Sequence, residues 1–142
     1  MTNHEMKSKV MTLGNRLAAN GADRSAAFTN AWAIVKRGGL ELAVKGVIIG
    51  SRQIALQRLA AYDPSQVRAV LVPEPNNTAD PAAIAVMVGV QNGRGLYRLG
   101  YVPREQAAGV KAMSGKLPAL RVVSGTWGRG KTTYGARLTL AA

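Results

Sequence analysis

Residues 73–86 join two segments of alternating character, and they read Pro73-Glu74-Pro75-Asn76-Asn77-Thr78-Ala79-Asp80-Pro81-Ala82-Ala83-Ile84-Ala85-Val86. In residues 67–72 and again in 84–90, apolar side chains recur with the period of two that is typical of a β-strand. Asparagine tolerates left-handed backbone and hydrogen-bonds within its own turn, so the adjacent Asn76 and Asn77 favour a tight connection. The sequence therefore predicts two strands joined by a structured loop.

Further strands are predicted on both sides of this pair. Upstream, the period of two begins at Leu40 and gives a strand that ends at Gly50. Downstream, the alternation predicts strands over 96–102, 120–123 and 134–140, and Pro103 opens a short helix over 104–113. Residues 51–65 are ambiguous. Six short strands with one late helix predict an α+β fold, namely a small, mostly antiparallel six-stranded OB-like β-barrel in residues 40–142.

The first 39 residues predict a separate helical hairpin. Met6, Val10, Leu13 and Leu17 repeat at helical spacing, and Asn20-Gly21 ends that helix. Asp23 is placed to cap a second helix, which Gly38-Gly39 ends. Its apolar stripe is predicted to consist of Phe28, Trp32 and Val35 with Ala27 and Ala31 beside them. The hairpin is too small to fold on its own core, so it must dock on another part of the chain.

The charge balance points to a polyanionic partner. The 142 residues carry 19 Lys and Arg against 7 Asp and Glu, a net charge of +12. The excess is spread along the chain, with +4 in residues 1–46 and +8 in 47–142. A protein this basic attracts nucleic acid, whereas no predicted helix sets a basic face against a broad aromatic one, as membrane binding would require. The alternative is a basic surface that serves solubility alone.

Composition excludes several chemistries. The chain has no cysteine, and its one histidine is His4, so disulfides, thiol catalysis, sulfur-ligated zinc and a three-histidine metal site are all excluded. The seven carboxylates show no spacing that suits a metal-dependent nuclease. We expect no cofactor and no metal. Apolar runs are short and the N-terminus lacks a secretory h-region, so we expect a soluble, cytoplasmic protein with no membrane partner.

Residues 125–132 match the phosphate-loop pattern G-x-x-x-x-G-K-[ST] letter for letter. That pattern binds nucleotide only between a strand and a helix, because the helix N-terminus receives the phosphates. The residues after Thr132 alternate as a strand does, and no later Asp is available for magnesium. We therefore predict a hairpin tip rather than a nucleotide site, and a protein that is not an enzyme.

Three segments of the chain, in order, resemble the HIRAN domain. The loop 73–86 resembles the family motif E/D-P-x-N-x-x-D-x-x-A-I-x-V. Upstream, Val47-Ile48-Ile49-Gly50-Ser51-Arg52 is similar to the family's opening strand and the arginine that follows it. Downstream, Leu99-Gly100-Tyr101-Val102-Pro103-Arg104-Glu105-Gln106-Ala107 is similar to the segment that enters the family's helix. The resemblance covers about Leu42 to Leu140.

This resemblance implies a modified OB-like barrel that binds DNA. HIRAN domains capture the 3′ end of single-stranded DNA in fork-remodelling helicases, and they also occur alone in bacteria and phages. In this chain the resemblance implies that Arg52 contacts a phosphate, that Asp80 accepts from a terminal 3′-hydroxyl and that Arg104 contacts the backbone. Gln53 and Ala79 stand where end-binding members carry aromatic residues.

Tyr101 or Trp127 could replace those missing stacking surfaces, and the resemblance places Trp127 close to a family aromatic residue. Core packing is the competing role for both. Asp80 also has a competing role, since an Asp before a Pro commonly fixes a loop. The candidate nucleic-acid-binding residues are Arg52, Gln53, Asp80, Tyr101, Arg104, Trp127, Arg129 and Lys131.

Two functions remain open from the sequence. The first is a non-enzymatic module that binds single-stranded DNA or DNA 3′ ends through a basic groove. The second is an interaction protein of phage or mobile-element type that binds and inhibits a host protein or nucleic-acid-handling complex. The helical hairpin resembles short N-terminal modules of small phage and plasmid proteins, which is the feature that favours the second.

Overall fold

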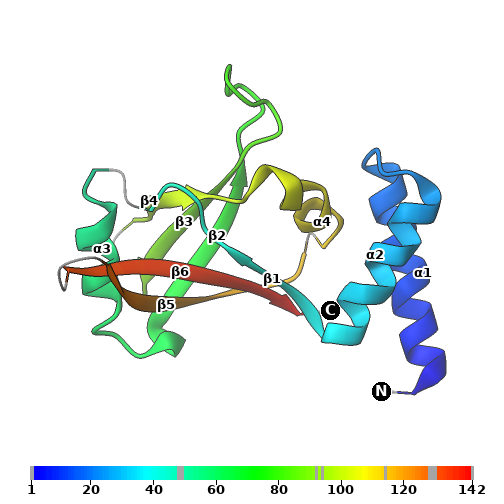
Figure 1. The fold of residues 1–142 in the computed structure, drawn as a ribbon, viewed down its shortest axis with the longest axis horizontal. Coiled ribbons are helices and arrows are strands. Elements are labelled where there is room, and N and C mark those ends of the chain that lie inside the picture. The colour runs from blue at the N-terminus through cyan, green and yellow to red at the C-terminus, as the bar shows by residue number, and fades with distance from the viewer. Residues whose placement is uncertain are drawn as a thin grey trace. The chain divides into compact units, whose positions relative to one another are not determined.

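The computed structural model describes residues 2–47, 50–91, 93, 95–113, 115–127 and 131–141, apart from the side chains of residues 126, 127 and 131. Within these residues the fold is α+β, with four α-helices and six strands (Figure 1). The elements in chain order are α1(Asn3–Ala19), α2(Arg24–Arg37), β1(Gly39–Ala43), α3(Arg52–Leu59), η1(Pro64–Gln66), β2(Val67–Pro73), β3(Ile84–Val90), β4(Tyr97–Tyr101), η2(Arg104–Gln106), α4(Ala107–Ala112), β5(Pro118–Trp127) and β6(Lys131–Ala141). No helix of this described part is long and apolar enough to cross a membrane.

The chain divides into two compact units. The first contains residues 1–41, 105–117 and 139–142, and the second contains 42–104 and 118–138. The predicted division into residues 1–39 and 40–142 differs from this, because α4 belongs with α1 and α2. The hairpin needed an apolar partner, and the segment around α4 provides it.

Local signals start and stop the helices of the first unit, and those at Asp23 and Gly38 were predicted. Thr2 caps α1 in a capping box: the Glu5 N–H donates to Thr2 Oγ1 at 3.1 Å, and the Thr2 N–H donates to Glu5 Oε2 at 3.0 Å. Asp23 Oδ2 accepts from the Ala26 N–H at 3.3 Å at the start of α2. Gly38 ends α2 with a φ of 84°, a left-handed conformation that favours glycine.

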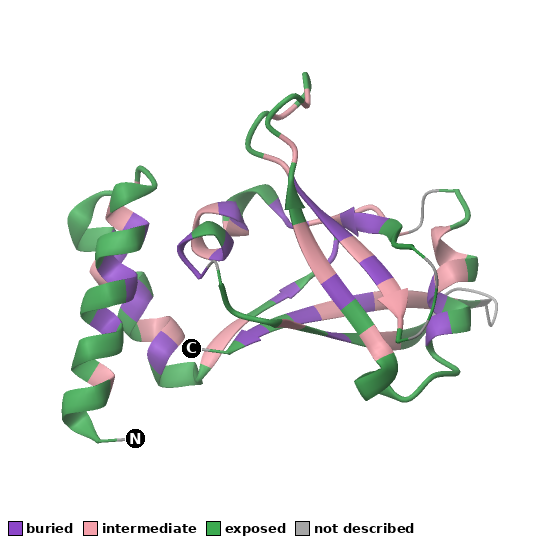
Figure 2. Cartoon of the chain, turned by 180° about the vertical axis from the view of Figure 1, so that it is seen from behind, coloured by how far each residue is buried: buried purple, intermediate pink, exposed green. Residues whose placement is uncertain are grey.

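The contact between α1 and α2 is made by smaller residues than predicted. Val10, Leu13 and Leu17 of α1 are buried, as their spacing indicated, but on α2 the buried residues are Ala27, Ala31 and Val35. The prediction for Trp32 was wrong, because it is 39% exposed, and Phe28 is half-buried. A Cβ at Gly14 would lie 2.5 Å from the Phe28 ring, so the glycine lets the two helices approach closely. Small residues therefore fill this interface, and Trp32 is exposed. Figure 2 shows the buried stretches of both helices in purple.

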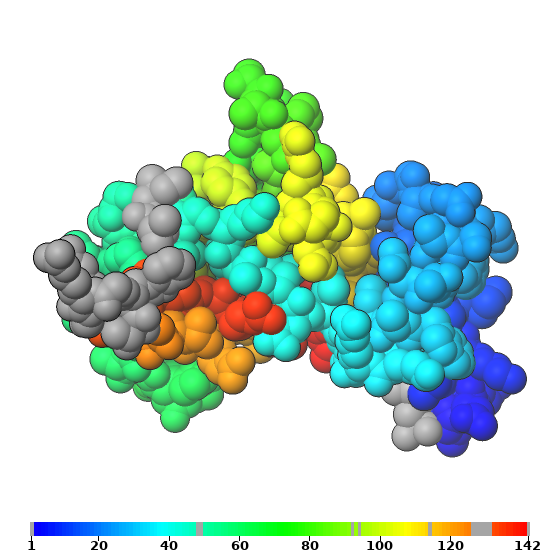
Figure 3. Space-filling view, viewed as in Figure 1, coloured from blue at the N-terminus to red at the C-terminus, as the bar shows by residue number. Residues whose placement is uncertain are grey.

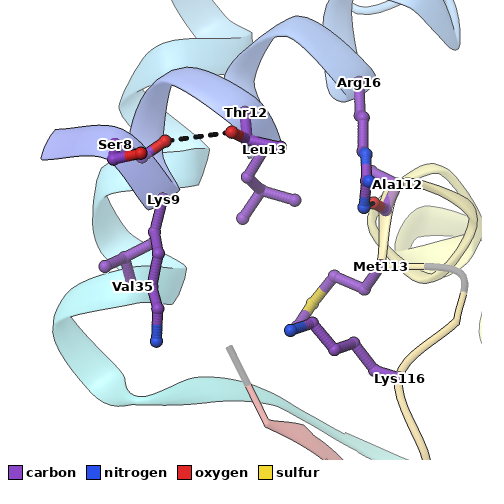
Figure 4. A pocket seen from close by; sticks show the side chains of 9 residues that line it. All are labelled: Ser8, Lys9, Thr12, Leu13, Arg16, Val35, Ala112, Met113 and Lys116. Atoms are coloured by element: carbon purple, nitrogen blue, oxygen red, sulfur yellow. Dashed lines mark hydrogen bonds between the residues drawn. The ribbon is translucent and has the colours of Figure 1, made fainter. Parts of the chain in front are cut away.

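A cavity of about 200 Å³ opens between the helices of the first unit (Figure 4). Leu13, Val35 and Met113 contribute apolar atoms, and cationic side chains of Lys9, Arg16 and Lys116 stand around them. An Arg16 guanidinium N–H donates to the Ala112 carbonyl at 3.4 Å, a long bond that links α1 to α4.

In the second unit, β2, β3 and β4 form an antiparallel sheet. Strands β2 and β3 pair in an unbroken register from Val67 opposite Val90 to Pro73 opposite Ile84, which confirms the two strands predicted around the loop. The pairing of β3 with β4 shifts between Val86 and Met87, where Gly100 and Arg98 are the successive partners. Leu99 is the extra residue of this β-bulge.

The second sheet has the order β1-β6-β5. The prediction that its opening strand runs to Gly50 was wrong, because β1 ends at Ala43, and in the described residues 44–47 a bond from Val44 to Ala136 and an isolated bridge from Lys45 to Tyr101 follow. Gly46 and Gly50 have φ values of 82° and 61°, and these left-handed residues turn the chain away from extended structure. Ile48 and Ile49 lie outside the described residues.

The ambiguous segment 51–65 contains α3 and the start of η1. The predicted helix over 104–113 consists of η2 followed by the shorter α4. In the described part the strands form two three-stranded sheets and no closed ring of hydrogen bonds. The largest fully buried side chains of the second unit come from α3 and from strands of both sheets, namely Leu56, Val86, Leu99 and Leu138.

Candidate nucleic-acid interface

The loop between β2 and β3 is held by its own side chains. Asn77 Oδ1 accepts from the Ala79 N–H at 3.0 Å and from the Asp80 N–H at 3.1 Å. The Asn77 Nδ2 donates to Glu74 Oε1 at 3.3 Å. Because one asparagine bridges both ends of the turn, residues 74–83 form a defined projection, which is green in Figures 1 and 3.

Asp80 divides its two carboxylate oxygens between the loop and an arginine. Asp80 Oδ1 accepts from the Ala82 N–H at 3.0 Å, which confirms the predicted role in fixing the loop. Asp80 Oδ2 lies 3.6 Å from Arg104 Nε, in the segment after β4. The Arg104 side chain is 76% exposed, so this ion pair leaves most of the guanidinium accessible to a ligand. The pair brings together the two sequence motifs that contain Asp80 and Arg104.

A second ion pair lies at the base of the same loop. Glu74 Oε2 is 2.7 Å from an Arg98 guanidinium nitrogen, and that guanidinium carbon lies 5.9 Å from the centroid of the Tyr101 ring. Residues three apart in a regular strand face opposite sides, but the bulge at Leu99 brings Arg98 and Tyr101 to one side. The two side chains line a shallow pocket with Glu74 and Asn77.

Tyr101 is half-buried beside this pair, and its environment favours the neutral phenol. Burial raises the pKa of Tyr101 above its ordinary value of 10.0, and hydrogen bonding to Glu74 adds to the rise. The charges of Arg98 and Arg52 lower the pKa of Tyr101, but by less. Arg52 is therefore close enough to act electrostatically on this ring. One Arg52 guanidinium N–H donates to the Gly46 carbonyl at 2.8 Å.

Gln53 has a structural use that the sequence did not indicate. Its Oε1 accepts from the Tyr134 N–H at 2.9 Å, and its Nε2 donates to the Tyr134 carbonyl at 2.7 Å. The same Nε2 donates to the Val47 carbonyl at 3.1 Å. The amide thus ties α3 to β6, and only a side chain with both a donor and an acceptor can make this set of bonds.

The remaining candidate residues belong to the β5–β6 hairpin. Trp127 ends β5 and Lys131 begins β6, but their side chains lie outside the described residues, as does Arg129 altogether. The residues after Lys131 continue as β6, so the phosphate-loop pattern has no helix behind it. This confirms the prediction of a strand after Thr132, with Ala136 and Leu138 buried.

The geometry therefore gathers three of the eight candidates, Asp80, Tyr101 and Arg104, at the loop and the end of β4. Arg52, at the start of α3, is linked to them through its charge on Tyr101. It also adds Glu74, Asn77 and Arg98, which sequence reasoning did not include. The bulge hides Arg98, because simple alternation predicts that it faces away from Tyr101. Asn77 had a visible signal in its Asn-x-x-Asp spacing, although its role is to build the loop.

Charge in the second unit is strongly one-sided. The unit contains 11 Lys and Arg against 3 Asp and Glu, a net charge of +8, and 9 of those 11 are Arg. Each carboxylate is engaged: Asp63 accepts from Ser65, Glu74 pairs with Arg98, and Asp80 holds the loop. The described residues contain no group of three or more His, Cys, Asp or Glu that could hold a metal ion.

These features define a small basic α+β domain in which Arg98 and Arg104 pair with carboxylates of a hydrogen-bonded loop, and arginine's planar fork suits phosphate. The family model of the HIRAN domain matches residues 48–123, which is more than half of the chain, and the chain belongs to the HIRAN family. HIRAN domains are associated with DNA binding. None of the curated proteins and none of the solved structures matches the chain.

Proposed function

We propose that this protein binds single-stranded DNA, with a preference for free 3′ ends, through the surface around the loop 74–83. The observation that carries the proposal is the Asp80–Arg104 pair. One Asp80 oxygen is used by the loop, and the other faces a cation and remains open to a hydrogen-bond donor. A terminal hydroxyl is such a donor, whereas an internal phosphodiester is not.

Electrostatics favours a strand at this surface. The Asp80 charge repels phosphate, but Arg104 pairs with it, and the unit carries a net charge of +8. A 3′-terminal nucleotide places its hydroxyl ahead of its own phosphate, so the hydroxyl reaches the carboxylate while the phosphate reaches an arginine. We also propose an OB-like arrangement of the two sheets, which the contact between β2 and β5 supports.

A binding titration tests the general function. We expect a labelled single strand with a free 3′ end to bind more tightly than a blunt duplex of the same length. If Arg52, Arg104, Arg129 and Lys131 neutralise about four phosphates, the logarithm of the association constant falls with a slope near −3 against the logarithm of salt concentration. Binding that does not weaken with salt would contradict the proposal and favour a protein partner, such as a host nucleic-acid-handling protein.

Two Asp80 variants test the preference for ends. For the wild type, replacing the free 3′-hydroxyl by a 3′-phosphate is expected to cost about 1–3 kcal/mol of binding free energy, the range of a hydrogen bond to a charged group. Asp80→Ala removes both carboxylate roles. Asp80→Asn keeps an Oδ1 acceptor for the Ala82 N–H and so isolates the charge. Equal affinity of the wild type for circular and linear strands would contradict end recognition.

The proposal is of a binding module without catalysis. The strand after Lys131 and the bonds of Asp63, Glu74 and Asp80 to other groups of the second unit support it. We expect the purified protein to release no phosphate from ATP with or without DNA. Turnover that Lys131→Ala abolishes would contradict this expectation.

A further inference from the structure

A groove in the second unit lies outside the surface just described. It has a volume of about 460 Å³ and runs between α3 and the β3–β4 hairpin. Its walls include Ile54 and Arg58 of α3, Tyr62 after that helix, and Leu96 and Tyr97 at the start of β4. The loop 74–83 contributes none of its residues.

Large apolar and aromatic side chains are exposed in this groove. Tyr62 is 46% exposed, Tyr97 is 38% exposed and Ile54 is 55% exposed. Removing apolar surface from water is favourable. A groove that leaves such surface exposed is therefore suited to a ligand with apolar faces. Two tyrosines from opposite walls offer planar rings on which flat groups can stack.

The ring of Tyr97 is held in place before any ligand arrives. The hydroxyls of Tyr97 and Ser51 lie 2.9 Å apart, which anchors the end of the ring to the N-terminus of α3. A side chain restrained in this way loses less conformational freedom on binding. On β3, Gly89 leaves the floor of the groove without a side chain beside Leu96.

The charge of the walls selects the kind of ligand. Among the described residues that line the groove, Arg58 is the one charged side chain, and no carboxylate is present to repel a polyanion. Nucleobases combine flat apolar faces with a negatively charged backbone, and aromatic rings beside arginine suit both parts.

We infer that this groove holds unpaired bases of a nucleic-acid strand, stacked on Tyr62 and Tyr97 with Arg58 at the backbone. The inference rests on the proposed function and extends it from the strand's terminus to its bases. The groove and the loop surface share β4, with Tyr97 at one end and Tyr101 at the other. Four residues of extended chain separate them by about 13 Å. Tyr97 faces the opposite side of the sheet from Arg98 and Tyr101, so a ligand strand that reaches both surfaces passes round β4, which ends the sheet β2-β3-β4. The groove's rings thereby replace the aromatic residues that the family pattern places at Gln53 and Ala79.

The test compares a thymidine oligomer with an abasic oligomer of equal length, because the two differ in bases and share their phosphates. We expect the wild type to bind the abasic strand more weakly. Tyr97→Ala should weaken binding of the thymidine strand about 5-fold to 150-fold, the range for one stacked base, and leave the abasic strand unchanged. Tyr97→Phe keeps the ring and should retain most of the affinity. Arg58→Gln should reduce the salt slope by about 0.7 for both strands.

Trp32→Ala is the matched control, because it removes an exposed aromatic residue from α2, outside the groove. It should change neither affinity. Thermal melting of each variant verifies that the fold is retained, and Tyr62→Ala replaces Tyr97→Ala if the latter unfolds.

Three outcomes separate the inference from the proposed function. If the wild type binds both strands equally and Tyr97→Ala has no effect, the inference that bases bind in the groove is wrong, and the proposed phosphate-driven binding stands. If the wild type binds no single strand, both are wrong. If Tyr97→Ala leaves binding of the thymidine strand unchanged but abolishes binding of a polyglutamate peptide, the groove is a protein-docking site and the inference fails.

Discussion

The loop 74–83 and the groove beside α3 belong to the same unit but are built in opposite ways. In the loop, the Asn77 amide bonds to the Glu74 carboxylate and to the Asp80 N–H. Glu74 and Asp80 each pair with an arginine, so most of these polar groups already have partners within the protein. In the groove, Ile54, Tyr62 and Tyr97 keep large apolar surfaces exposed, and a single hydroxyl contact restrains one ring. The polar groups of the loop are bonded within the protein, whereas the apolar side chains of the groove remain exposed to solvent.

The difference indicates how the two regions respond to change. A substitution in the loop removes hydrogen bonds that form its shape, so it alters the site and the local stability together. A substitution on the groove walls removes exposed surface that the folded chain does not need, so it alters binding while stability remains. Variants that affect one region and spare the other therefore measure how much the loop and the groove each contribute to the binding free energy.

The largest effect is expected at Gly100, which supports both regions through β4. A Cβ at this residue would collide with the Lys45 carbonyl oxygen and lie 2.8 Å from Val44 Cγ1. Lys45 and Tyr101 exchange two backbone hydrogen bonds there, so the neighbouring chain cannot move away freely. Gly100→Ala should lower the free energy of unfolding by about 3 kcal/mol, the upper part of the range for overpacking, in urea denaturation.

Gly125→Ala is the control for Gly100→Ala, because nothing lies within 4 Å of a Cβ at Gly125. It should change stability by less than about 0.5 kcal/mol. Equal midpoints for the two variants would contradict the close approach at Gly100.

Gln53→Ala is expected to damage the groove and spare the loop. The change removes all three hydrogen bonds that hold α3 to Tyr134 and Val47, at a cost of about 1–3 kcal/mol for the groups left without partners. Because α3 carries one wall of the groove, affinity for the thymidine strand should fall, whereas discrimination between free and blocked 3′ ends should persist.

Melting temperature and both titrations check the Gln53 prediction. Gln53→Glu keeps an acceptor for the Tyr134 N–H and loses both donated bonds, so it should be intermediate. A loss of end discrimination in Gln53→Ala, with base binding retained, would contradict the separation of the two regions.

Asn77→Ala is the converse variant, because it removes three hydrogen bonds within the loop. By analogy with helix caps, the loss should be about 0.5–2 kcal/mol in the free energy of unfolding. Discrimination between free and blocked 3′ ends should disappear while the preference for thymidine over abasic strands remains. Asn76→Ala, at the exposed neighbouring asparagine, should leave both unchanged, and an equal effect of the two variants would refute the role given to Asn77.

The smallest effect concerns pH. The pKa of Tyr101 is raised in the folded protein, so the folded state keeps the phenolic proton at a pH where the unfolded chain has lost it. This contribution to stability is fully present below pH 10.0 and is lost as the pH rises through the folded-state pKa. The free energy of unfolding should therefore fall more steeply above pH 10 for the wild type than for Tyr101→Phe. Parallel curves for the two proteins would contradict it.

Sequence reasoning identified what depends on local chemistry. The strands around residues 73–86 and the caps at Asp23 and Gly38 follow from turn residues and periodicity, and the structure has them there. The family resemblance also brought Asp80 and Arg104 forward, and the structure pairs them.

Features that depend on contacts between residues far apart in the chain could not be predicted from the sequence. A bulge at Leu99 leaves no mark in an alternating pattern, so the sequence did not indicate that Arg98 and Tyr101 share a face. Trp32 satisfied helical spacing, but the buried residues of α2 are Ala27, Ala31 and Val35, and the space at Gly14 is taken by the Phe28 ring. The groove required α3, which lies in a segment whose sequence favoured no structure, and so Tyr62 and Tyr97 were not recognised as a pair.

The Gln53 amide has a consequence for the behaviour of the protein at high concentration. Its paired bonds with Tyr134 have the pattern of two peptide groups in an antiparallel ladder, and they continue along β6 beyond the last bond from Val44 to Ala136. The Gln53 side chain thus occupies the backbone N–H and carbonyl of Tyr134 in β6. Without it, these groups could pair with a strand of another molecule. A chain that lacks this amide would present an open edge, and self-association would compete with folding as concentration rises.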